Sequence, residues 1–189
     1  MSAATITVFT PTYNRAHLLP RLYASLLRQT SKDFSWLVID DGSTDHTREL
    51  VQNWINEKKI VIRYHYKENG GMHTAHNAAY ELIDTELNTC IDSDDWMPDD
   101  AVGKIVSFWR RNGGDRYYGI IALDAIADGK VIGCKLPKDR KDIRFCEFYA
   151  KGGTGDKKLT CRTKVMRQYP PYPVFAGEKY FSLGYKYLL

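Results

Sequence analysis

Four strand-like segments, each followed by a helix-like segment, occupy the first hundred residues and constrain the fold of this chain more than any other feature. The expected strands are residues 5–10, 34–39, 60–66 and 88–91. Each is a short run rich in β-branched, aromatic or other apolar residues, as buried strands are. Strands that alternate with helices predict a mostly parallel sheet with helices on both faces, joined by right-handed crossovers. We therefore expect an α/β, Rossmann-like fold.

The expected helices carry apolar residues at the spacing of an amphipathic α-helix. In the first, over residues 17–29, Leu18, Leu22 and Leu26 share one face. Three further helices are expected around residues 50–55, over 72–82 and over 101–111. The last of them follows a proline and two aspartates, which is a typical helix entrance.

Beyond residue 113 the pattern changes. Residues 118–127 and 130–136 predict a hairpin around the two-residue turn Asp128-Gly129. The glycine-rich, polar stretch 151–158 predicts a loop. Because 189 residues can bury one good core, we expect a single domain, with residues 1–112 as its first half and 113–189 as its smaller second half.

Net charge and cysteine content indicate which partners and which cellular compartment are expected for the protein. The net charge of +4 suits a polyanionic substrate or an anionic membrane surface, although a solvated basic face explains it more simply. The four cysteines have no metal-like spacing, which predicts reduced thiols in a cytosolic protein. No signal-peptide pattern and no apolar run of roughly 18 to 20 residues is present, so any membrane contact is expected to be peripheral.

Three carboxylates follow the fourth expected strand within four residues, at Asp92, Asp94 and Asp95. Carboxylates this close together lie either on a solvated turn or around a cation that compensates them. Hard oxygen ligands suit Mg²⁺ or Mn²⁺, which take one or two carboxylates plus the phosphates of a substrate. An EF-hand loop is excluded, because Trp96 and Met97 stand where a ligand and a glycine would be needed.

The loops after the four strands are expected to gather at one edge of the sheet, where open α/β sheets bind ligands. Asp40 and Asp41 follow the second strand, and Lys67 and Asn77 lie in or just after the loop of the third. We expect Asn77 and Lys67 to contact a ribose or phosphate, or else to be solvated. For the aspartate pair the alternative is a turn with a helix cap. His73 and His76 are three residues apart, but two histidines without a third ligand are more often packing residues.

Five motifs occur in an order that resembles the glycosyltransferase family 2 enzymes, which have the GT-A fold. They are Thr10-Pro-Thr-Tyr-Asn-Arg15, Ser25-Leu-Leu-Arg-Gln-Thr30, Asp40-Asp-Gly-Ser-Thr-Asp45, Asn69-Gly-Gly71 with Ala75-His-Asn77, and Asp92-Ser-Asp-Asp95. The resemblance implies transfer of a sugar from a nucleotide-sugar, with UDP the expected nucleotide, to an acceptor hydroxyl with inversion at the anomeric carbon. The resemblance also implies that residues 1–112 bind the nucleotide-sugar donor and that residues 113–189 form the acceptor side.

The resemblance also implies roles for individual residues. Pro11, Thr12 and Tyr13 would line the nucleotide pocket, with Tyr13 packing against the base unless it is a buried aromatic at the strand end. Asp41 resembles the residue that hydrogen-bonds the uracil. Asp94 and Asp95 match the metal motif for Mn²⁺ or Mg²⁺, with Asp95 on the metal and Asp94 also on the ribose or sugar side. Asp92 matches a frequent extra acid.

Inverting transfer needs a general base to take the proton of the acceptor hydroxyl. Gly177-Glu178-Lys179-Tyr180 resembles a Gly-Glu-Lys-Phe element of some bacterial polysaccharide members, which makes Glu178 the candidate. The alternative is an exposed glutamate that starts a helix. Asp124 and Asp156 are weaker candidates.

Taken together, the motifs imply a metal-dependent enzyme of bacterial surface-polysaccharide synthesis that acts on a saccharide or lipid-linked acceptor. Its expected location is the cytoplasm, at the inner face of the membrane where the acceptor is lipid-linked. Relatives commonly continue beyond the candidate base, so the chain is also consistent with a truncated form. Two other functions stay open: a nucleotide-sugar binding module without catalysis, and an Asp-dependent phosphatase or phosphotransferase. Nucleic-acid binding has little support, because no basic and aromatic patch dominates.

Overall fold

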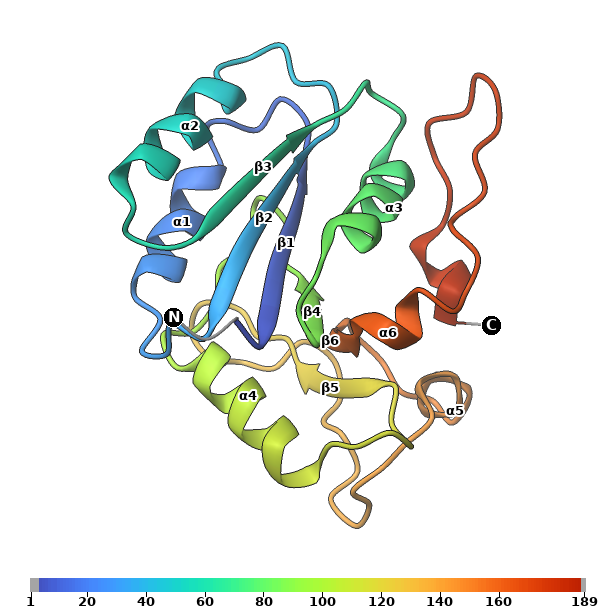
Figure 1. The fold of residues 1–189 in the computed structure, drawn as a ribbon. Coiled ribbons are helices and arrows are strands. Elements are labelled where there is room, and N and C mark those ends of the chain that lie inside the picture. Colours follow the sequence, from blue (N-terminus) through green and yellow to red (C-terminus); the bar gives the residue numbers. More distant parts are fainter. Residues whose placement is uncertain (1–3, 188–189) are drawn as a thin grey trace.

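Six strands form one mixed sheet in the computed structural model, which describes residues 4–187 (Figure 1). The strands are β1 (Ile6–Thr12), β2 (Phe34–Asp40), β3 (Ile62–Tyr66), β4 (Leu87–Cys90), β5 (Gly119–Leu123) and β6 (Lys157–Arg162). Their order is β3-β2-β1-β4-β6-β5. The first four run parallel, and β6 is antiparallel to both β4 and β5. The expected α/β class with a mostly parallel sheet is confirmed.

Helices cover both faces of this sheet. They are α1 (Leu19–Leu27), α2 (Thr47–Glu57), α3 (Met72–Leu82), α4 (Ala101–Asn112), α5 (Phe145–Ala150) and α6 (Thr163–Met166), with a 3-10 turn at Leu183–Tyr187. The first two and α4 pack on one face, and α3, α6 and the C-terminal segment lie on the other (Figure 1).

Alternation along the central strands explains this two-sided core. Val8 and Trp36 point to the face of α1, α2 and α4, whereas their neighbours Phe9 and Leu37 point to the face of α3. All four side chains are buried. A strand buried on both faces is rich in apolar residues, which is why β1 and β2, buried along their whole length, were recognisable in the sequence.

β1 runs two residues further than predicted, through Pro11 to Thr12. Pro11 pairs with Ile39 of β2, so the proline does not break the strand. The reason lies on the other side of β1, where the Phe9 carbonyl accepts the N–H of Ile91 and pairing with β4 stops at Cys90. Two residues beyond Phe9, Pro11 points its backbone to that same side, where no ladder bond needs the missing N–H.

The second half differs more from the prediction. The turn at Asp128-Gly129 is present, but Ala125 and Val131 make an isolated bridge instead of a hairpin. β5 pairs with β6, a strand that begins inside the predicted loop 151–158. Its sequence, Lys-Lys-Leu-Thr-Cys-Arg, is polar at most positions, so its strand character depends on pairing between β4 and β5 and not on an apolar run.

Candidate functional site

Loops from different strands meet at the carboxyl edge of the parallel sheet, as predicted. The loop after β1 contacts the loop after β2, because Ser43 Oγ accepts the N–H of Asn14 at 2.9 Å. The same loop reaches the segment after β4 through Arg15, which pairs with Asp94 at 2.9 Å. The predicted donor-site positions therefore come from loops that touch one another.

Asp41 directly follows β2 at this edge and is buried. Its carboxylate accepts a hydrogen bond from Lys67 Nζ at 2.5 Å and from the N–H groups of Gly70 at 3.0 Å and Gly71 at 2.8 Å. Asn69 Nδ2 donates to it as well, at 3.2 Å. Asp41 thus organises the loop that leads into α3, and Lys67 supplies a cation beside it.

Asp40, its neighbour, has a different role. It is fully buried, and its carboxylate accepts hydrogen bonds from Tyr64 Oη at 2.5 Å and from the N–H of Ser43 at 2.7 Å. Burial and this carboxylate raise the pKa of Tyr64. Asp40 therefore fits the turn role that sequence left open for the pair, and it faces the sheet instead of the edge.

The residues at the end of β1 differ in how far they are exposed to solvent. Pro11 and Thr12 are buried, and the hydroxyl of Thr12 has no hydrogen-bond partner among the described residues. Tyr13 is 48% exposed, so it is not the buried aromatic of the alternative interpretation. An exposed ring at this edge is free to pack against a planar ligand.

Asn77, a predicted nucleotide-sugar contact, points its amide at the C-terminal segment. Nδ2 donates to the carbonyl of Tyr172 at 2.9 Å, and Oδ1 accepts the N–H of Tyr172 at 2.8 Å. A direct role of Asn77 at the donor stays a prediction.

The aspartate motif forms a tight turn after β4, closed by a hydrogen bond from the N–H of Asp95 to the carbonyl of Asp92 at 3.0 Å. Asp95 is 54% exposed, and its carboxylate lies 4.0 Å from Lys158 Nζ. Burial of part of the group raises the pKa of Asp95; Lys158 opposes this, and Asp92, Asp94 and Asp124 add to it. Asp124 thus adds a further carboxylate to the three of the motif.

Lys158 and Asp124 are the site residues that sequence reasoning missed or ranked low. Burial lowers the pKa of Lys158, but Asp124, Asp92 and Asp95 outweigh it, so the pKa is raised overall. Burial raises the pKa of Asp124, against the effect of Lys158. Asp124 directly follows β5 and Lys158 lies on β6, so only the antiparallel pairing of these strands brings them to the motif. No local signal in the sequence indicates that pairing.

The donor set at this turn fits a divalent cation that is completed by a substrate. Within residues 4–187, no three His, Cys, Asp or Glu side chains are close enough together to enclose a metal ion unaided. Mg²⁺ and Mn²⁺ do not require such a cage, because one or two carboxylates with substrate phosphates and water suffice. Asp95 and Asp94 supply hard oxygen atoms of this kind.

His73 and His76 are buried packing residues on α3. Nδ1 of His76 lies 3.1 Å from Tyr80 Oη, and Nε2 lies 3.7 Å from Cys90 Sγ. Burial, with the charge of Lys186, lowers the pKa of His76 to about 3, so the ring is neutral. Their burial and contacts fit the packing role that was the favoured interpretation of this pair.

Glu178 is exposed on the C-terminal segment, and its N–H donates to the carbonyl of Phe175 at 3.1 Å. The residue does not begin a helix, contrary to that part of the alternative interpretation, and its role as the base stays a prediction. Its position near the edge follows from Lys179, whose carbonyl faces Gly71 of the Asp41 loop.

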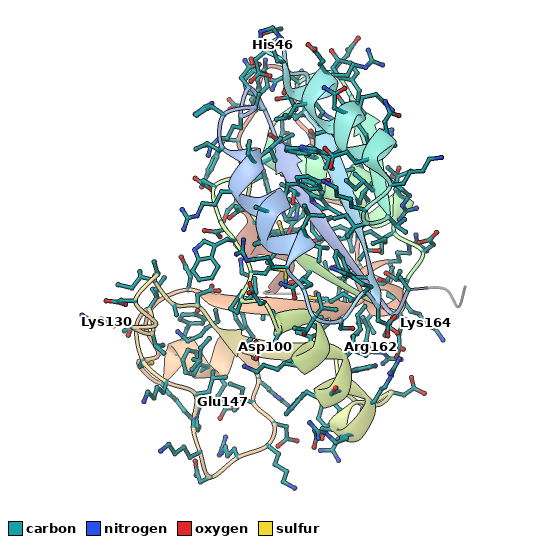
Figure 2. All side chains as sticks on the ribbon, turned by 90° about the vertical axis from the view of Figure 1, so that its left-hand side faces the viewer. His46, Asp100, Lys130, Glu147, Arg162 and Lys164 are labelled. Carbon is teal, nitrogen blue, oxygen red and sulfur yellow. The ribbon has the colours of Figure 1, made fainter. Side chains whose placement is uncertain are left out.

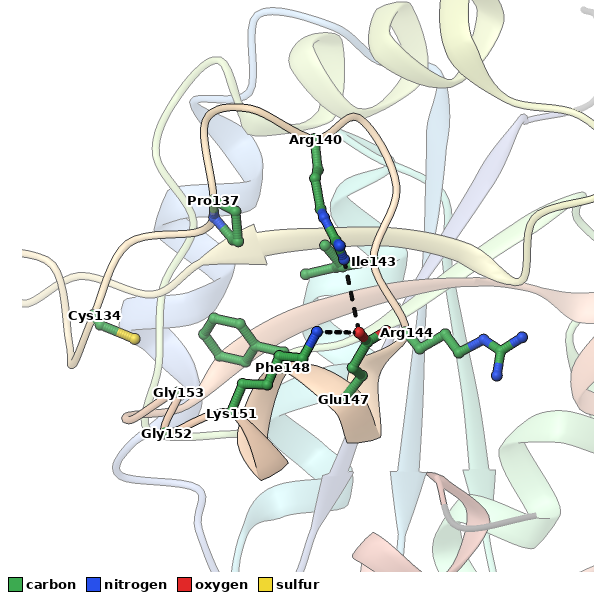
Figure 3. Close-up of a pocket in the computed structure, with 10 residues that line it drawn as sticks. All are labelled: Cys134, Pro137, Arg140, Ile143, Arg144, Glu147, Phe148, Lys151, Gly152 and Gly153. Atoms are coloured by element: carbon green, nitrogen blue, oxygen red, sulfur yellow. Dashed lines mark hydrogen bonds and ion pairs between the residues drawn. The ribbon is translucent and has the colours of Figure 1, made fainter.

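A pocket elsewhere contains none of the predicted site residues. It lies between residues 134 and 153, with Glu147 paired to Lys151 at 2.5 Å and to Arg140 at 3.7 Å (Figure 3). Arg144 points away from this pair (Figure 3). Lys130 and Glu147 both lie in this part of the molecule, far from His46 in the loop between β2 and α2 (Figure 2).

Comparison with known proteins decides the family. The sequence model described as "Glycosyl transferase family 2" matches residues 7–166. The chain belongs to this family.

Glycosyltransferase GlyA of Streptococcus pneumoniae is 35% identical over 51% of this chain and 14% of that protein. Validoxylamine A glucosyltransferase of Streptomyces hygroscopicus is 39% identical over 47% of this chain and 21% of that protein.

Solved structures share the fold of this family 2 chain. The crystal structure of S. aureus TarS 1–349 has a TM-score of 0.67 at 21% identity, and covers 91% of this chain and 52% of that one. TarS structures with UDP and with UDP-GlcNAc are similar to the chain as well. Mannosyltransferase PcManGT from Pyrobaculum calidifontis, in complex with GDP-Man and Mn²⁺, has a TM-score of 0.64 at 19% identity over 95% of this chain and 50% of that one.

This family 2 chain spans about half of those structures and less than a quarter of the two curated relatives. Among residues 4–187, no helix combines the length and the apolar character needed to cross a membrane.

Proposed function

We propose that this chain transfers a sugar from a nucleotide-sugar, UDP-linked in our proposal, to an acceptor hydroxyl with inversion at the anomeric carbon. The observation that supports the proposal is the contact between three loops at one sheet edge in a family 2 chain. The loop that carries Tyr13 touches both the loop that carries Asp41 and the Asp92 to Asp95 turn. That TarS binds UDP and UDP-GlcNAc supports the choice of nucleotide. Family membership disfavours the phosphatase alternative, and a turnover assay separates catalysis from simple donor binding.

Each side chain at the edge has a proposed task. The exposed ring of Tyr13 packs against the base of the nucleotide. The buried carboxylate of Asp41 accepts a hydrogen bond from an N–H of the same base. Accepting that hydrogen bond requires Asp41 to release a contact with its own loop, since its oxygens already have loop donors. Asp94 faces the ribose or sugar after exchanging its contact with Arg15.

Asp95 is the proposed metal ligand, with Asp94 beside it. A bound Mn²⁺ or Mg²⁺ would neutralise negative charge that develops on the departing diphosphate. That PcManGT was solved with Mn²⁺ supports this choice of cation.

Glu178 is the proposed general base. As the acceptor oxygen forms its bond to the anomeric carbon and the bond from that carbon to the diphosphate oxygen breaks, the acceptor proton passes to the Glu178 carboxylate. An exposed glutamate on the segment beside Gly71 has the access that this task needs. Synthesis of a surface polysaccharide on a lipid-linked acceptor, at the inner face of the membrane, is the proposed setting.

Calorimetric titration with UDP, GDP and dTDP, each with and without Mn²⁺, tests the donor site. We expect UDP to bind about tenfold more tightly with Mn²⁺, and Asp95→Asn to lose that gain, since a bond to a charged group is worth on the order of 1.5 to 3 kcal/mol. Asp99→Asn is the matched control, because Asp99 pairs with Arg28 away from the motif. Wild-type behaviour of Asp95→Asn would remove Asp95 as the ligand.

Glu178→Gln tests the base. We expect UDP affinity to stay within about twofold of wild type, and turnover of the UDP-sugar to fall about a hundredfold or more, because general-base catalysis contributes roughly 10² to 10⁴ in rate. Turnover is measured as release of UDP. Full activity in this variant would show that another group takes the proton, with Asp124 the next to test.

A further inference from the structure

The C-terminal segment 172–187, which we call the strap, lies along α3 on one face of the sheet (Figure 1). It carries Glu178 in its middle. Tyr172 begins the strap and is 1% exposed, with its ring edge-on to His76. The strap is therefore packed into the core at its start, while Glu178 itself is solvent-exposed.

Asn77 holds the start of the strap in a two-point contact. Its amide donates to the Tyr172 carbonyl at 2.9 Å and accepts the Tyr172 N–H at 2.8 Å. One side-chain amide thus satisfies both backbone groups of a single residue, as a neighbouring strand would. The Tyr172 hydroxyl then donates to the carbonyl of Leu183 at 3.0 Å, which ties the two ends of the strap together.

Gly71 sets how closely the middle of the strap approaches the sheet edge. Its φ is +95°, and a Cβ at this position would lie 1.9 Å from the carbonyl oxygen of Lys179. The N–H of the same glycine donates to Asp41. A side chain here would displace the strap, so the glycine allows Glu178 to sit next to the loop that Asp41 organises.

The far end of the strap has its own anchors. Lys186 is buried, with Nζ 4.8 Å from the ring centre of Tyr80 and 5.2 Å from that of Tyr172. Phe181 packs on His73 of α3, at 6.1 Å between ring centres. Together with the Asn77 contact to Tyr172, these contacts attach the strap to α3 on both sides of Glu178.

We propose that Asn77 is a positioning residue, which clamps the strap to α3 and so holds Glu178 at the donor edge, and that it does not contact the nucleotide-sugar. The inference rests on the proposed function, in which Glu178 is the base. A base on a loop must be kept within hydrogen-bond reach of the acceptor hydroxyl, and a displacement of about 1 Å can reduce the rate about a hundredfold. Asn77 achieves this from the buried side of the strap, where its amide has both partners.

The test compares Asn77→Ala with Phe181→Ala, which loosens the strap where Phe181 packs on His73 of α3 and leaves the two hydrogen bonds of the Asn77 amide in place. Asn112→Ala on α4 is the control, since its amide donates to the Phe108 carbonyl within the same helix. For each protein we would measure deuterium uptake of residues 172–187, UDP affinity with Mn²⁺, and turnover of a UDP-sugar. Far-ultraviolet circular dichroism verifies that each variant is folded.

We expect both strap variants to exchange faster over 172–187, to bind UDP within about twofold of wild type, and to lose about tenfold or more in kcat with little change in the donor KM. Loss of UDP affinity in Asn77→Ala, with unchanged exchange in the strap, would overturn the proposal and make Asn77 a donor ligand. Faster exchange with unchanged kcat would overturn the claim that the Asn77 contact holds Glu178 in position for catalysis. If wild type binds no nucleotide, the proposed function fails instead, and the exchange measurement still decides whether Asn77 clamps the strap.

Discussion

Lys158 is the single side chain that most changes the electrostatics of the aspartate motif. It is 25% exposed and lies 4.0 Å from Asp95, with Asp92 and Asp124 also acting on it. An internal ammonium group compensates these carboxylates in the absence of a divalent cation, and it competes with such a cation for them. We therefore expect it to weaken binding of the proposed metal ion until a diphosphate adds its own negative charge.

Lys158→Met is expected to bind Mn²⁺ alone about fivefold more tightly than wild type. The magnitude follows from a partly exposed ion pair, which is worth up to about 1 kcal/mol. Mn²⁺ titration by electron paramagnetic resonance measures it. Lys164→Met, which removes an exposed lysine from α6, controls for net charge. Equal Mn²⁺ affinity in wild type and Lys158→Met would show that the lysine does not compete for the carboxylates.

At the scale of single residues, sequence reasoning found positions that follow strands and missed positions that depend on pairing. Asp41 and the aspartate motif come directly after parallel strands, whose carboxyl ends must share an edge. Lys158 reaches the same place from β6, more than sixty residues later, through antiparallel ladders that no local pattern encodes.

At the scale of elements, the helix α3 was predicted with its observed bounds, and it begins directly after the paired glycines Gly70 and Gly71. The helix α5 and the strand β6 were not predicted. α5 has only six residues, and β6, whose buried positions are Lys157, Thr160 and Cys161, depends on its neighbouring strands. Short or polar elements take their structure from tertiary contacts, which a single sequence does not display.

His76 on α3 also makes the free energy of unfolding depend on pH. The folded-state pKa is lowered to about 3 from an ordinary value of 6.5, mainly by burial. As pH falls below 6.5 the unfolded chain takes up a proton that the folded chain does not, so stability is lost with falling pH, by at most about 1.4 kcal/mol per pH unit. Above 6.5 both states are neutral at this residue, and the term is absent.

His76→Gln is expected to flatten the loss of unfolding free energy between pH 6.5 and 4.5, because it keeps a neutral polar group beside Tyr80 and cannot take up a proton. Urea unfolding at several pH values measures the slope. His46→Gln is the control, since His46 is an exposed residue before α2. An unchanged slope in His76→Gln would mean that the buried imidazole is protonated in the folded protein.

At the scale of the whole molecule, β6 joins the two halves of the chain into one sheet. It pairs with β4 from the first half and β5 from the second. Asn88 Nδ2 donates to the Cys161 carbonyl at 3.2 Å, and Thr89 Oγ1 donates to the Leu159 carbonyl at 2.9 Å. The second half contributes no separate sheet among residues 4–187, because its strands belong to the same sheet as β4. Neither half can lose its structure without exposing the strand edge of the other.

Unfolding should therefore be one cooperative transition, and the distribution of two residue types makes this measurable. All four tryptophans lie before residue 113, so tryptophan fluorescence reports on the first half. Cys161 on β6 is buried, so its modification by a thiol reagent, read by mass spectrometry of its peptide, reports on the second. We expect the two probes to give the same urea midpoint, as two-state unfolding requires. Modification of Cys161 at clearly lower urea than the fluorescence change would mean that β5 and β6 detach first, and that the donor half is stable without its antiparallel neighbours.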